Sequence, residues 1–352
     1  MDGARMNTLQ LIETAHRMMA DGKGLLAMDE STPTCNERFA ALGIAQTEAA
    51  RRSWRELLIT TRGLADNISG VILYDETIHQ RCADGTPFVN VLNDVGIVVG
   101  IKVDAGAKAL AGHKGEKITE GLDGLRERLQ AYSALGARFA KWRAVISMGD
   151  GIPGAACIAA NAHALARYAA LCQEAGLVPI VEPEVLMTGD HTLQRCADVS
   201  TQLLQEVFEQ LYVQGVMLEG MILKPNMILP GVDCEYQDSV DDVADACVTA
   251  LLRFVPAAVA GIAFLSGGQS AELASARLNA MNRRFNSTLP WPLTFSFARA
   301  IQQPALELWR GDPGKVAKAQ RALLHRTLCN RAARQGEYSL AMENRTTPII
   351  DA

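Results

Sequence analysis

The chain has 352 residues, of which 49% are hydrophobic and 21% are charged, and 34 Lys and Arg against 39 Asp and Glu give a formal net charge of −5. This composition excludes a disordered chain, a collagen-like chain and a disulfide-dense scaffold, and the mild acidity argues against a nucleic-acid partner. The longest nearly apolar stretch, Val255–Leu265, is only 11 residues long, so we expect no membrane partner.

The cysteines and the first residues indicate a cellular compartment. The eight cysteines show no C-x-x-C spacing, and Met1–Gln10 lacks the apolar segment of a secretory leader. We therefore expect reduced cysteines in a cytoplasmic protein.

Eight short apolar runs predict strands along the chain. In order, they are Leu25–Asp29, Val71–Asp75, Val98–Asp104, Phe139–Val145, Val178–Glu184, Met221–Lys224, Ile262–Ser266 and Leu293–Phe297. The segments between them are long enough for a helix and two loops. Such alternation is typical of a parallel sheet covered by helices.

Helix signals occur between these runs. They comprise an apolar period from Leu122 to Tyr132 with a stop at Gly136, an alanine-rich segment Ala155–Glu174, a capping pattern at Ser239 and a start at Asp312-Pro313.

The pattern predicts an α/β protein with a (β/α)8 TIM-barrel fold. No linker interrupts the series, so we expect a single domain over 1–352, with a barrel core at about 20–310 and a C-terminal helix and tail at about 312–352. An open doubly wound sheet is the alternative, but no strand is followed by G-x-G-x-x-G.

Charged residues end most of the predicted strands. In three strands the charges are two residues apart: Lys102 and Asp104, Lys141 and Arg143, and Glu182 and Glu184. Because strand side chains alternate with a period of two, each pair faces the same side. Each charge alone could be a solvated loop residue, but together they predict a charged barrel mouth.

Lys224 is the candidate nucleophile. Pro225 keeps it extended, and the apolar residues before it place its stem in a desolvated setting. Burial near Lys141 or Lys102 lowers the pKa of such an amine, and a neutral amine can form a Schiff base with a carbonyl. A salt bridge to Glu182 or Glu184 is the alternative, and both interpretations can hold together.

Glu182 and Glu184 are candidate acid and base groups. Crowding two carboxylates raises the pKa of one, which allows it to act as an acid while the other stays ionised. The alternative is that both only neutralise the lysines.

Ser266-Gly267-Gly268 with Arg299 predicts a phosphate site. Glycine backbone N–H groups can converge on an anion beside a helix N-terminus, and phosphate sites after strands 7 and 8 recur in these barrels. A plain turn is the alternative. The six histidines show no metal-binding spacing, so we expect no metal site.

Five motifs resemble those of class I fructose-bisphosphate aldolases, in order between about Lys23 and Tyr338. They are GLLAMDES at 24–31, FAKWR at 139–143, IVEPE at 180–184, LKPNM at 223–227 and FLSGGQ at 264–269. The resemblance implies reversible cleavage of fructose 1,6-bisphosphate to dihydroxyacetone phosphate and glyceraldehyde 3-phosphate in glycolysis and gluconeogenesis. It also implies catalysis without metal or other cofactor, and a homotetramer.

The resemblance assigns the following roles. Lys224 is the Schiff-base lysine, Glu182 the acid and base for carbinolamine formation and dehydration, and Asp29 the base for the C4 hydroxyl. Glu184 and Lys141 shape the charge around Glu182. The substrate- and phosphate-binding residues implied are Ser266, Gly267, Gly268 and Arg299 at the C1 end, Ser31, Lys102 and Arg38 at the C6 end, and Arg143 in the same mouth.

Three departures from the family are visible. The chain ends Pro348-Ile349-Ile350-Asp351-Ala352, without the terminal tyrosine that helps proton exchange in the animal type. Thr32-Pro33-Thr34 replaces a frequent Thr-Gly-Ser and removes one backbone donor. Ala298 precedes Arg299 where glycine is usual, so its N–H can bind phosphate only if the local φ is allowed.

Other functions stay open on the sequence alone. One is another Schiff-base barrel lyase, or a transaldolase-like enzyme, acting on a different phosphosugar. A metal-dependent aldolase is a second, and a non-catalytic phosphosugar-binding scaffold is a third.

Overall fold

Eight parallel strands close into a barrel in this computed structural model, which describes residues 2–20 and 22–344. The strand order is β1-β10-β9-β8-β7-β6-β3-β2. The strands are β1 (Gly24–Ala27), β2 (Ile68–Leu73), β3 (Val98–Lys102), β6 (Phe139–Ile146), β7 (Val178–Val185), β8 (Ile222–Leu223), β9 (Ile262–Phe264) and β10 (Leu293–Phe297). Each of the eight apolar runs contributes one strand, which confirms the predicted (β/α)8 fold.

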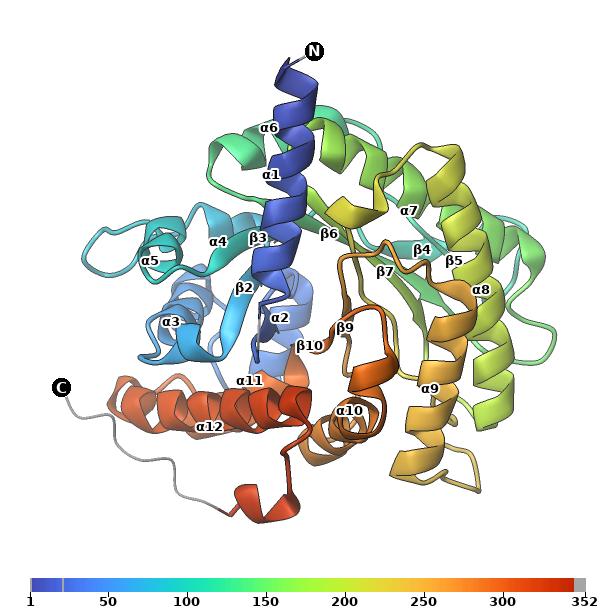
Figure 1. Ribbon diagram of the computed structural model, residues 1–352. Coiled ribbons are helices and arrows are strands. Elements are labelled where there is room, and N and C mark those ends of the chain that lie inside the picture. Colours follow the sequence, from blue (N-terminus) through green and yellow to red (C-terminus); the bar gives the residue numbers. More distant parts are fainter. Residues whose placement is uncertain (1, 21, 345–352) are drawn as a thin grey trace.

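Helices surround the barrel, with α7, α8 and α9 along one side and α12 across another (Figure 1). The bounds are α1 (Asp2–Met18), α2 (Thr32–Ala40), α3 (Glu48–Ile59), α4 (Asp75–Ile78), α5 (Phe88–Asp94), α6 (Leu125–Ala134), α7 (Ala155–Glu174), α8 (Leu193–Val213), α9 (Val240–Phe254), α10 (Ala271–Phe285), α11 (Arg299–Trp309) and α12 (Val316–Gln335). Of the helices in the described ranges, none combines the length and apolar character needed to span a membrane.

Local sequence explains several helix ends. Ser239 and Asp242 form the predicted capping box of α9, in which each side chain bonds the other residue's backbone N–H. Asp312 accepts from the Gly314 N–H at 2.9 Å and starts a 3-10 turn, Pro313–Lys315, that leads into α12. These caps satisfy backbone groups that have no partner inside a helix.

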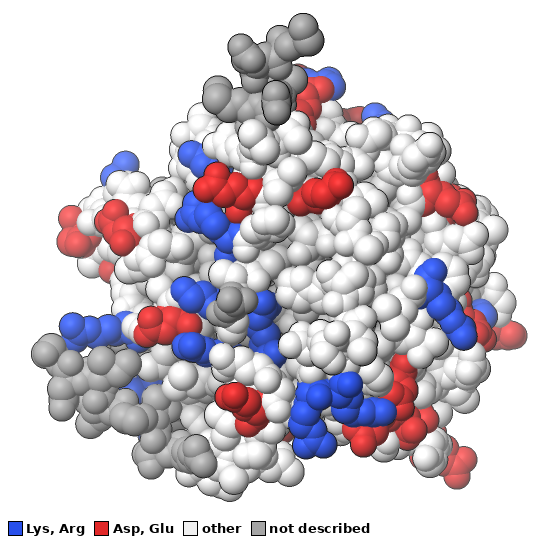
Figure 2. All heavy atoms as spheres, in the orientation of Figure 1, with Lys and Arg blue, Asp and Glu red and all other residues white. Residues whose placement is uncertain are grey.

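The first helix closes one end of the barrel. Leu11, Ala15 and Met18 of α1 pack with Val98 and Phe139, the residues at which β3 and β6 begin. Figure 1 shows α1 crossing the barrel, and Figure 2 shows this same face with small groups of both charge signs. Since apolar side chains fill the N-terminal end, a cavity can open only at the carboxyl ends of the strands.

One glycine is needed for this packing. A Cβ at Gly100 would come within 2.1 Å of the Phe139 ring. Only glycine therefore lets the ring lie against β3 inside the barrel.

Three features differ from the strand and helix predictions. Helix α1 and the antiparallel pair β4 (Ala107–Ala109) and β5 (Lys117–Thr119) were not predicted. Strand β7 continues one residue past the predicted end at Glu184, so Pro183 lies within it. The proline is tolerated because β8 is only two residues long and pairs with Ile180 and Val181, before the proline is reached.

Candidate active site

A cavity of about 870 Å³ opens at the carboxyl ends of the barrel strands. Every site residue expected from the sequence lines it: Asp29, Ser31, Arg38, Lys102, Lys141, Arg143, Glu182, Glu184, Lys224, Ser266, Gly267, Gly268 and Arg299. The structure thus brings all of these positions together, from seven of the eight barrel strands and the residues that follow them.

Strand β2 contributes no charge to the cavity. The sequence grouped Asp75 with the converging strand-end charges, but it begins α4 instead. Its side chain is 60% exposed and accepts a hydrogen bond from Tyr132 at 2.7 Å. Asp75 therefore lies outside the cavity.

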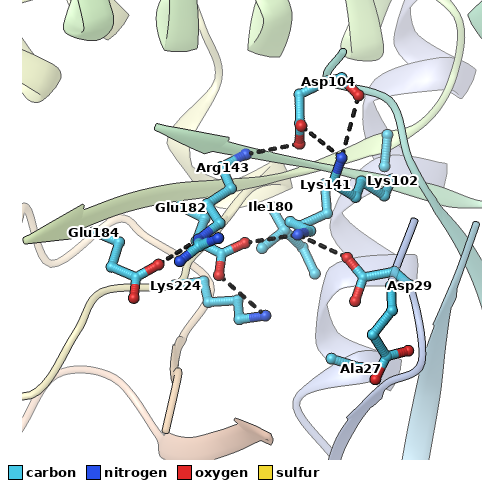
Figure 3. A network of polar contacts seen from close by, with 12 residues as sticks. Ala27, Asp29, Lys102, Asp104, Lys141, Arg143, Ile180, Glu182, Glu184 and Lys224 are labelled. Carbon is cyan, nitrogen blue, oxygen red and sulfur yellow. Dashed lines mark hydrogen bonds and ion pairs between the residues drawn. The ribbon is translucent and has the colours of Figure 1, made fainter. Parts of the chain in front are cut away.

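Two lysines and two carboxylates form the centre of the site (Figure 3). The Lys141 Nζ lies 2.7 Å from Asp29 Oδ2 and 3.0 Å from Glu182 Oε2. The Lys224 Nζ lies 3.3 Å from the other Glu182 oxygen, Oε1. All four side chains are at most 9% exposed, so these contacts are poorly screened by water.

The backbone fixes how Lys224 is presented. Its N–H donates to the Val181 carbonyl at 2.8 Å, which continues the β7–β8 ladder one residue beyond β8. Pro225 follows, and its carbonyl accepts from the Leu265 N–H at 3.1 Å. The residue therefore stays extended and its side chain enters the barrel mouth.

The two lysines have opposite pKa shifts. Burial lowers the pKa of Lys224, and Lys141 lowers it further, while the attraction of Glu182 compensates only in part. Burial also opposes the charge of Lys141, but Asp29 and Glu182 outweigh it and raise its pKa. Lys141 is therefore a permanent cation, and Lys224 is the amine that reaches its neutral form more readily.

The carboxylates do not behave as the sequence predicted. Crowding of Glu182 with Glu184 was expected to raise one pKa. Although burial raises the pKa of Glu182, the positive charges of Lys141 and Lys224 outweigh it and the net shift is downward. Burial likewise opposes ionisation of Asp29, but Lys141 and Lys224 lower its pKa. Both carboxylates are therefore ionised bases at neutral pH.

Glu184 has a different partner. It forms an ion pair with the Nε of Arg143, which lies beside Glu182 in the β6–β7 register. The backbone N–H of Arg143 donates to Asp104 Oδ2 at 3.2 Å. Glu184 therefore orients Arg143 at the mouth.

Asp104 was named in a strand-end motif but not selected as a site residue. Its Oδ1 lies 2.6 Å from the Lys102 Nζ, and its side chain is only 2% exposed. The spacing of two residues could have identified this pair, because it places both side chains on the same face of the chain.

A tight turn with two left-handed glycines forms the anion cradle. The Gln269 N–H donates to the Ser266 carbonyl at 3.0 Å, and Gly267 and Gly268 have φ of 58° and 90°. These values match a type I′ turn, which favours glycine at both central positions. Arg299 reaches over it: a Cβ at Gly268 would lie 3.3 Å from the Arg299 Nη2. Backbone N–H groups and a guanidinium thus converge on one side of the cavity.

The residue before Arg299 does not obstruct this cradle. Ala298 has a φ of −103°, which is negative as residues with a Cβ prefer, and a ψ of −88°, which lies outside the helical and extended ranges. The condition on φ that the sequence analysis set for Ala298 is therefore met.

Ser31 and Arg38 follow β1 and line the cavity beside α11, whose Gln302 and Gln303 accept hydrogen bonds from Arg38. Ser31 is the N-cap of α2, and its Oγ lies 3.0 Å from Thr34 Oγ1. Pro33 falls in the first turn of α2, where its missing N–H has no helical partner to lose. The expected loss of a donor therefore has little effect on the helix itself.

Glu30 organises this end and was not identified from the sequence. It forms ion pairs with Arg38 and, at 2.7 Å, with Arg55, and it accepts from Gln302 Nε2 at 2.9 Å. Arg38 also donates to Gln302 and Gln303. The partners come from α2, α3 and α11, so no local sequence signal could reveal the cluster.

One group elsewhere has the composition of a metal site. The ligand atoms of His325, Cys329 and Glu343 lie within 4.8 Å of one another. However, Glu343 is ion-paired with Arg326 and accepts from Tyr338 at 2.7 Å, and burial raises the Cys329 pKa to about 11. A protonated thiol, an occupied carboxylate and a neighbouring cation do not fit a metal.

A closed (β/α)8 barrel with a charged cavity at the carboxyl ends of its strands has the architecture of a barrel enzyme. The family model described as "Glycolytic: Fructose-bisphosphate aldolase class-I" matches residues 10–348. The chain belongs to the class I fructose-bisphosphate aldolase family, which confirms the resemblance found in its motifs.

Relatives support this assignment over nearly the whole chain. A protein from Xanthomonas campestris pv. campestris named "Probable fructose-bisphosphate aldolase class 1" is 55% identical over 334 residues, covering 95% of this chain and 99% of the relative. "Fructose-bisphosphate aldolase 6, cytosolic" from Arabidopsis thaliana is 49% identical over 329 residues, covering 94% of this chain and 91% of the relative.

A solved structure agrees with the fold. The fructose-bisphosphate aldolase of Plasmodium falciparum, in a complex with TRAP and a small-molecule inhibitor, superposes with a TM-score of 0.93. It is 44% identical, and the match covers 95% of this chain and 96% of that one.

Proposed function

We propose that the protein cleaves fructose 1,6-bisphosphate reversibly to dihydroxyacetone phosphate and glyceraldehyde 3-phosphate through a Schiff base on Lys224. The observation that carries this proposal is the buried Lys224 amine, with its lowered pKa, 3.3 Å from the ionised Glu182. A neutral amine beside a base is the arrangement that nucleophilic attack on a ketone requires.

Carbinolamine formation and dehydration use Glu182. When the Lys224 nitrogen attacks the C2 ketone, it must lose a proton, and Glu182 is close enough to receive it. Glu182 then returns that proton to the C2 oxygen, which completes the carbinolamine hydroxyl. A second proton, taken up from solvent through Glu182, lets this hydroxyl leave as water, and the protonated imine remains. The lowered pKa of Glu182 suits the first transfer, in which it acts as a base.

Cleavage uses Asp29. The ionised carboxylate accepts the C4 hydroxyl proton as the C3–C4 bond breaks, and the bonding electrons pass to the protonated imine to form an enamine. Lys141 bonds both Asp29 and Glu182, so one fixed cation holds both bases ionised and in place. The C-terminal segment without tyrosine lies outside the described residues, and we assign no proton donor to the enamine.

Two sets of residues that line the cavity bind the two phosphates in this proposal. The Ser266–Gly268 turn and Arg299 receive the phosphate at C1, while Ser31, Lys102 and Arg38 lie at the C6 end, with Arg143 in the same mouth. Glycine N–H groups and arginines are the donors that proteins use for phosphate.

We also propose a single-domain, cytoplasmic homotetramer that works in glycolysis and gluconeogenesis. The family resemblance supports the tetramer, and the cytosolic Arabidopsis relative supports the compartment. All eight cysteines are free, as a reducing compartment allows. Light scattering behind a sizing column measures the assembly directly.

A coupled assay with purified protein tests the reaction. We expect fructose 1,6-bisphosphate cleavage that is unchanged in EDTA and absent in Lys224→Met, with Lys114→Met, an exposed lysine, as the matched control. Loss of activity in EDTA would indicate a metal-dependent aldolase. Cleavage of only another phosphosugar would indicate a different lyase, and phosphosugar binding without turnover would indicate a scaffold.

A further inference from the structure

A buried arginine without an acidic partner lies behind the anion cradle. Arg277, in α10, is only 6% exposed. Its Nη1 donates to Gln269 Oε1 at 2.8 Å, and its Nε is buried with no hydrogen-bond partner among the described residues. Within 2–20 and 22–344, no carboxylate forms an ion pair with it.

Two other buried arginines in this protein are neutralised by carboxylates. Arg51 pairs with Glu76 at 2.6 Å, and Arg55 pairs with Glu30 at 2.7 Å. A buried charge is costly unless it is paired, and a guanidinium does not lose its proton in a protein. Burial also lowers the pKa of Arg277, with only the Cys247 thiol opposing that shift. Arg277 therefore lacks the counter-charge that the other two have.

The hydrogen bond from Arg277 to Gln269 indicates where a counter-charge would bind. Gln269 closes the Ser266–Gln269 turn, whose glycines line the cavity. Its Nε2 also contacts the Met227 Sδ at 3.6 Å, three residues after Lys224. One side chain thus joins Arg277 to the cradle and to the loop that follows the nucleophile.

We propose that Arg277 is a positioning residue for the anion cradle, which holds Gln269 in place and whose missing counter-charge is the C1 phosphate of the bound substrate. This inference rests on the proposed function, because it takes the cradle as the C1-phosphate site. Arg277 acts through Gln269 and through its charge, without touching the reacting atoms.

In this proposal the positive charge of Arg277 stabilises the protein when phosphate is bound and destabilises it when the cradle is empty. Removing its charge should therefore weaken phosphate binding without destabilising the free protein. A purely structural arginine would behave in the opposite way, since its loss would destabilise the free protein and leave phosphate affinity intact.

The test compares Arg277→Gln and Arg277→Met with Arg277→Lys and with Arg283→Gln, which removes an exposed charge from the same helix. Binding of inorganic phosphate is measured by calorimetry, the melting temperature is measured without phosphate, and kcat and KM are measured with fructose 1-phosphate, which carries its only phosphate at the ketone end.

We expect Arg277→Gln and Arg277→Met to weaken phosphate binding and raise KM about tenfold, the size of one charge interaction near a protein surface, with kcat within about twofold. The melting temperature without phosphate should not fall. Arg277→Lys should retain affinity within about threefold, and Arg283→Gln should match the unmodified protein.

Two results would overturn the inference: unchanged phosphate affinity and KM in both neutral variants, or a lower melting temperature with reduced kcat and unchanged KM. If one neutral variant fails to fold, the other still decides between these results. Absence of any cleavage by the unmodified protein would instead refute the proposed function, and calorimetry would still test the Arg277 contribution to phosphate binding.

Discussion

Two lysines of the same buried network should respond differently to the same substitution. Lys141→Met should destabilise the protein by about 3–5 kcal/mol, the usual cost of removing one partner from a buried ion pair. Lys224→Met should change stability by less than about 1.5 kcal/mol, because methionine matches the lysine stem in shape. Both variants should lose activity.

The expected difference in stability between the two variants follows from the ion-pair distances of the two lysines. With an effective dielectric constant of about 20, contacts at 2.7 and 3.0 Å contribute roughly 6 and 5.5 kcal/mol of attraction to Lys141, and one contact at 3.3 Å contributes about 5 kcal/mol to Lys224. Desolvation of each ion costs several kcal/mol. After this desolvation cost is subtracted, the ion pairs of Lys141 still stabilise the folded protein. Those of Lys224 contribute little, because Lys141 also repels its charge. Without Lys141, Asp29 and Glu182 would also be buried close to each other.

Urea unfolding followed by far-ultraviolet circular dichroism at pH 7.5 measures both variants, with Lys114→Met as the exposed control. We expect unchanged slopes, a clearly lower midpoint for Lys141→Met and midpoints near that of the unmodified protein for the other two. The electrostatic reasoning is wrong if Lys141→Met is no less stable than Lys224→Met.

Three further predictions concern pH, phosphate and thiols. Because burial lowers the pKa of Lys224 from its ordinary 10.5, the amine loses its proton as the pH rises, so kcat/KM should increase with pH and level off below 10.5; an increase that continues past that pH contradicts the shift. Arg299→Ala should raise KM for fructose 1-phosphate about 10- to 100-fold through loss of a charged hydrogen bond, and steady-state kinetics showing an unchanged KM would exclude Arg299 from the phosphate site. At pH 8, a thiol reagent should titrate only the partly exposed Cys82 and Cys234 in the native protein, and the remaining six cysteines only after unfolding. Cys82 should react slowly, because burial raises its pKa to about 11. Rapid modification of a third thiol would contradict the described burial.

The barrel could be predicted from the sequence because its strands are buried on both faces. Such strands are continuous apolar runs, and all eight predicted runs match the ends of real strands to within about three residues, with Leu293–Phe297 identical to β10. Strands β4 and β5 have only three residues each, which is too short for a periodic signal. Helix α1 was missed because the first residues were tested only as a possible leader.

The positions of the site residues were more predictable from the sequence than their pKa shifts. Spacing of two residues correctly placed Lys141 with Arg143 and Glu182 with Glu184 at the barrel mouth. The predicted mutual crowding of Glu182 and Glu184 does not raise the pKa of Glu182, because register decides which charges face each other: Glu184 is ion-paired with Arg143, and Glu182 lies between two lysines that lower its pKa. That information comes from the closed barrel and not from sequence neighbours.

The residues that were missed depend on contacts distant in sequence. Glu30 binds Arg55 and Gln302, which are 25 and 272 residues away. Arg277 is only eight residues from Gln269, but it stands out only through its burial without an acidic partner among the described residues, which the fold alone determines. No periodicity or motif in a single sequence encodes such pairs.

Chemical trapping tests the covalent mechanism most directly. Incubating the protein with dihydroxyacetone phosphate and borohydride should reduce the imine to a stable secondary amine, seen as one added triose phosphate per chain and mapped by mass spectrometry to Lys224. An adduct on Lys141 or Lys102, or none at all in an active preparation, would contradict the account.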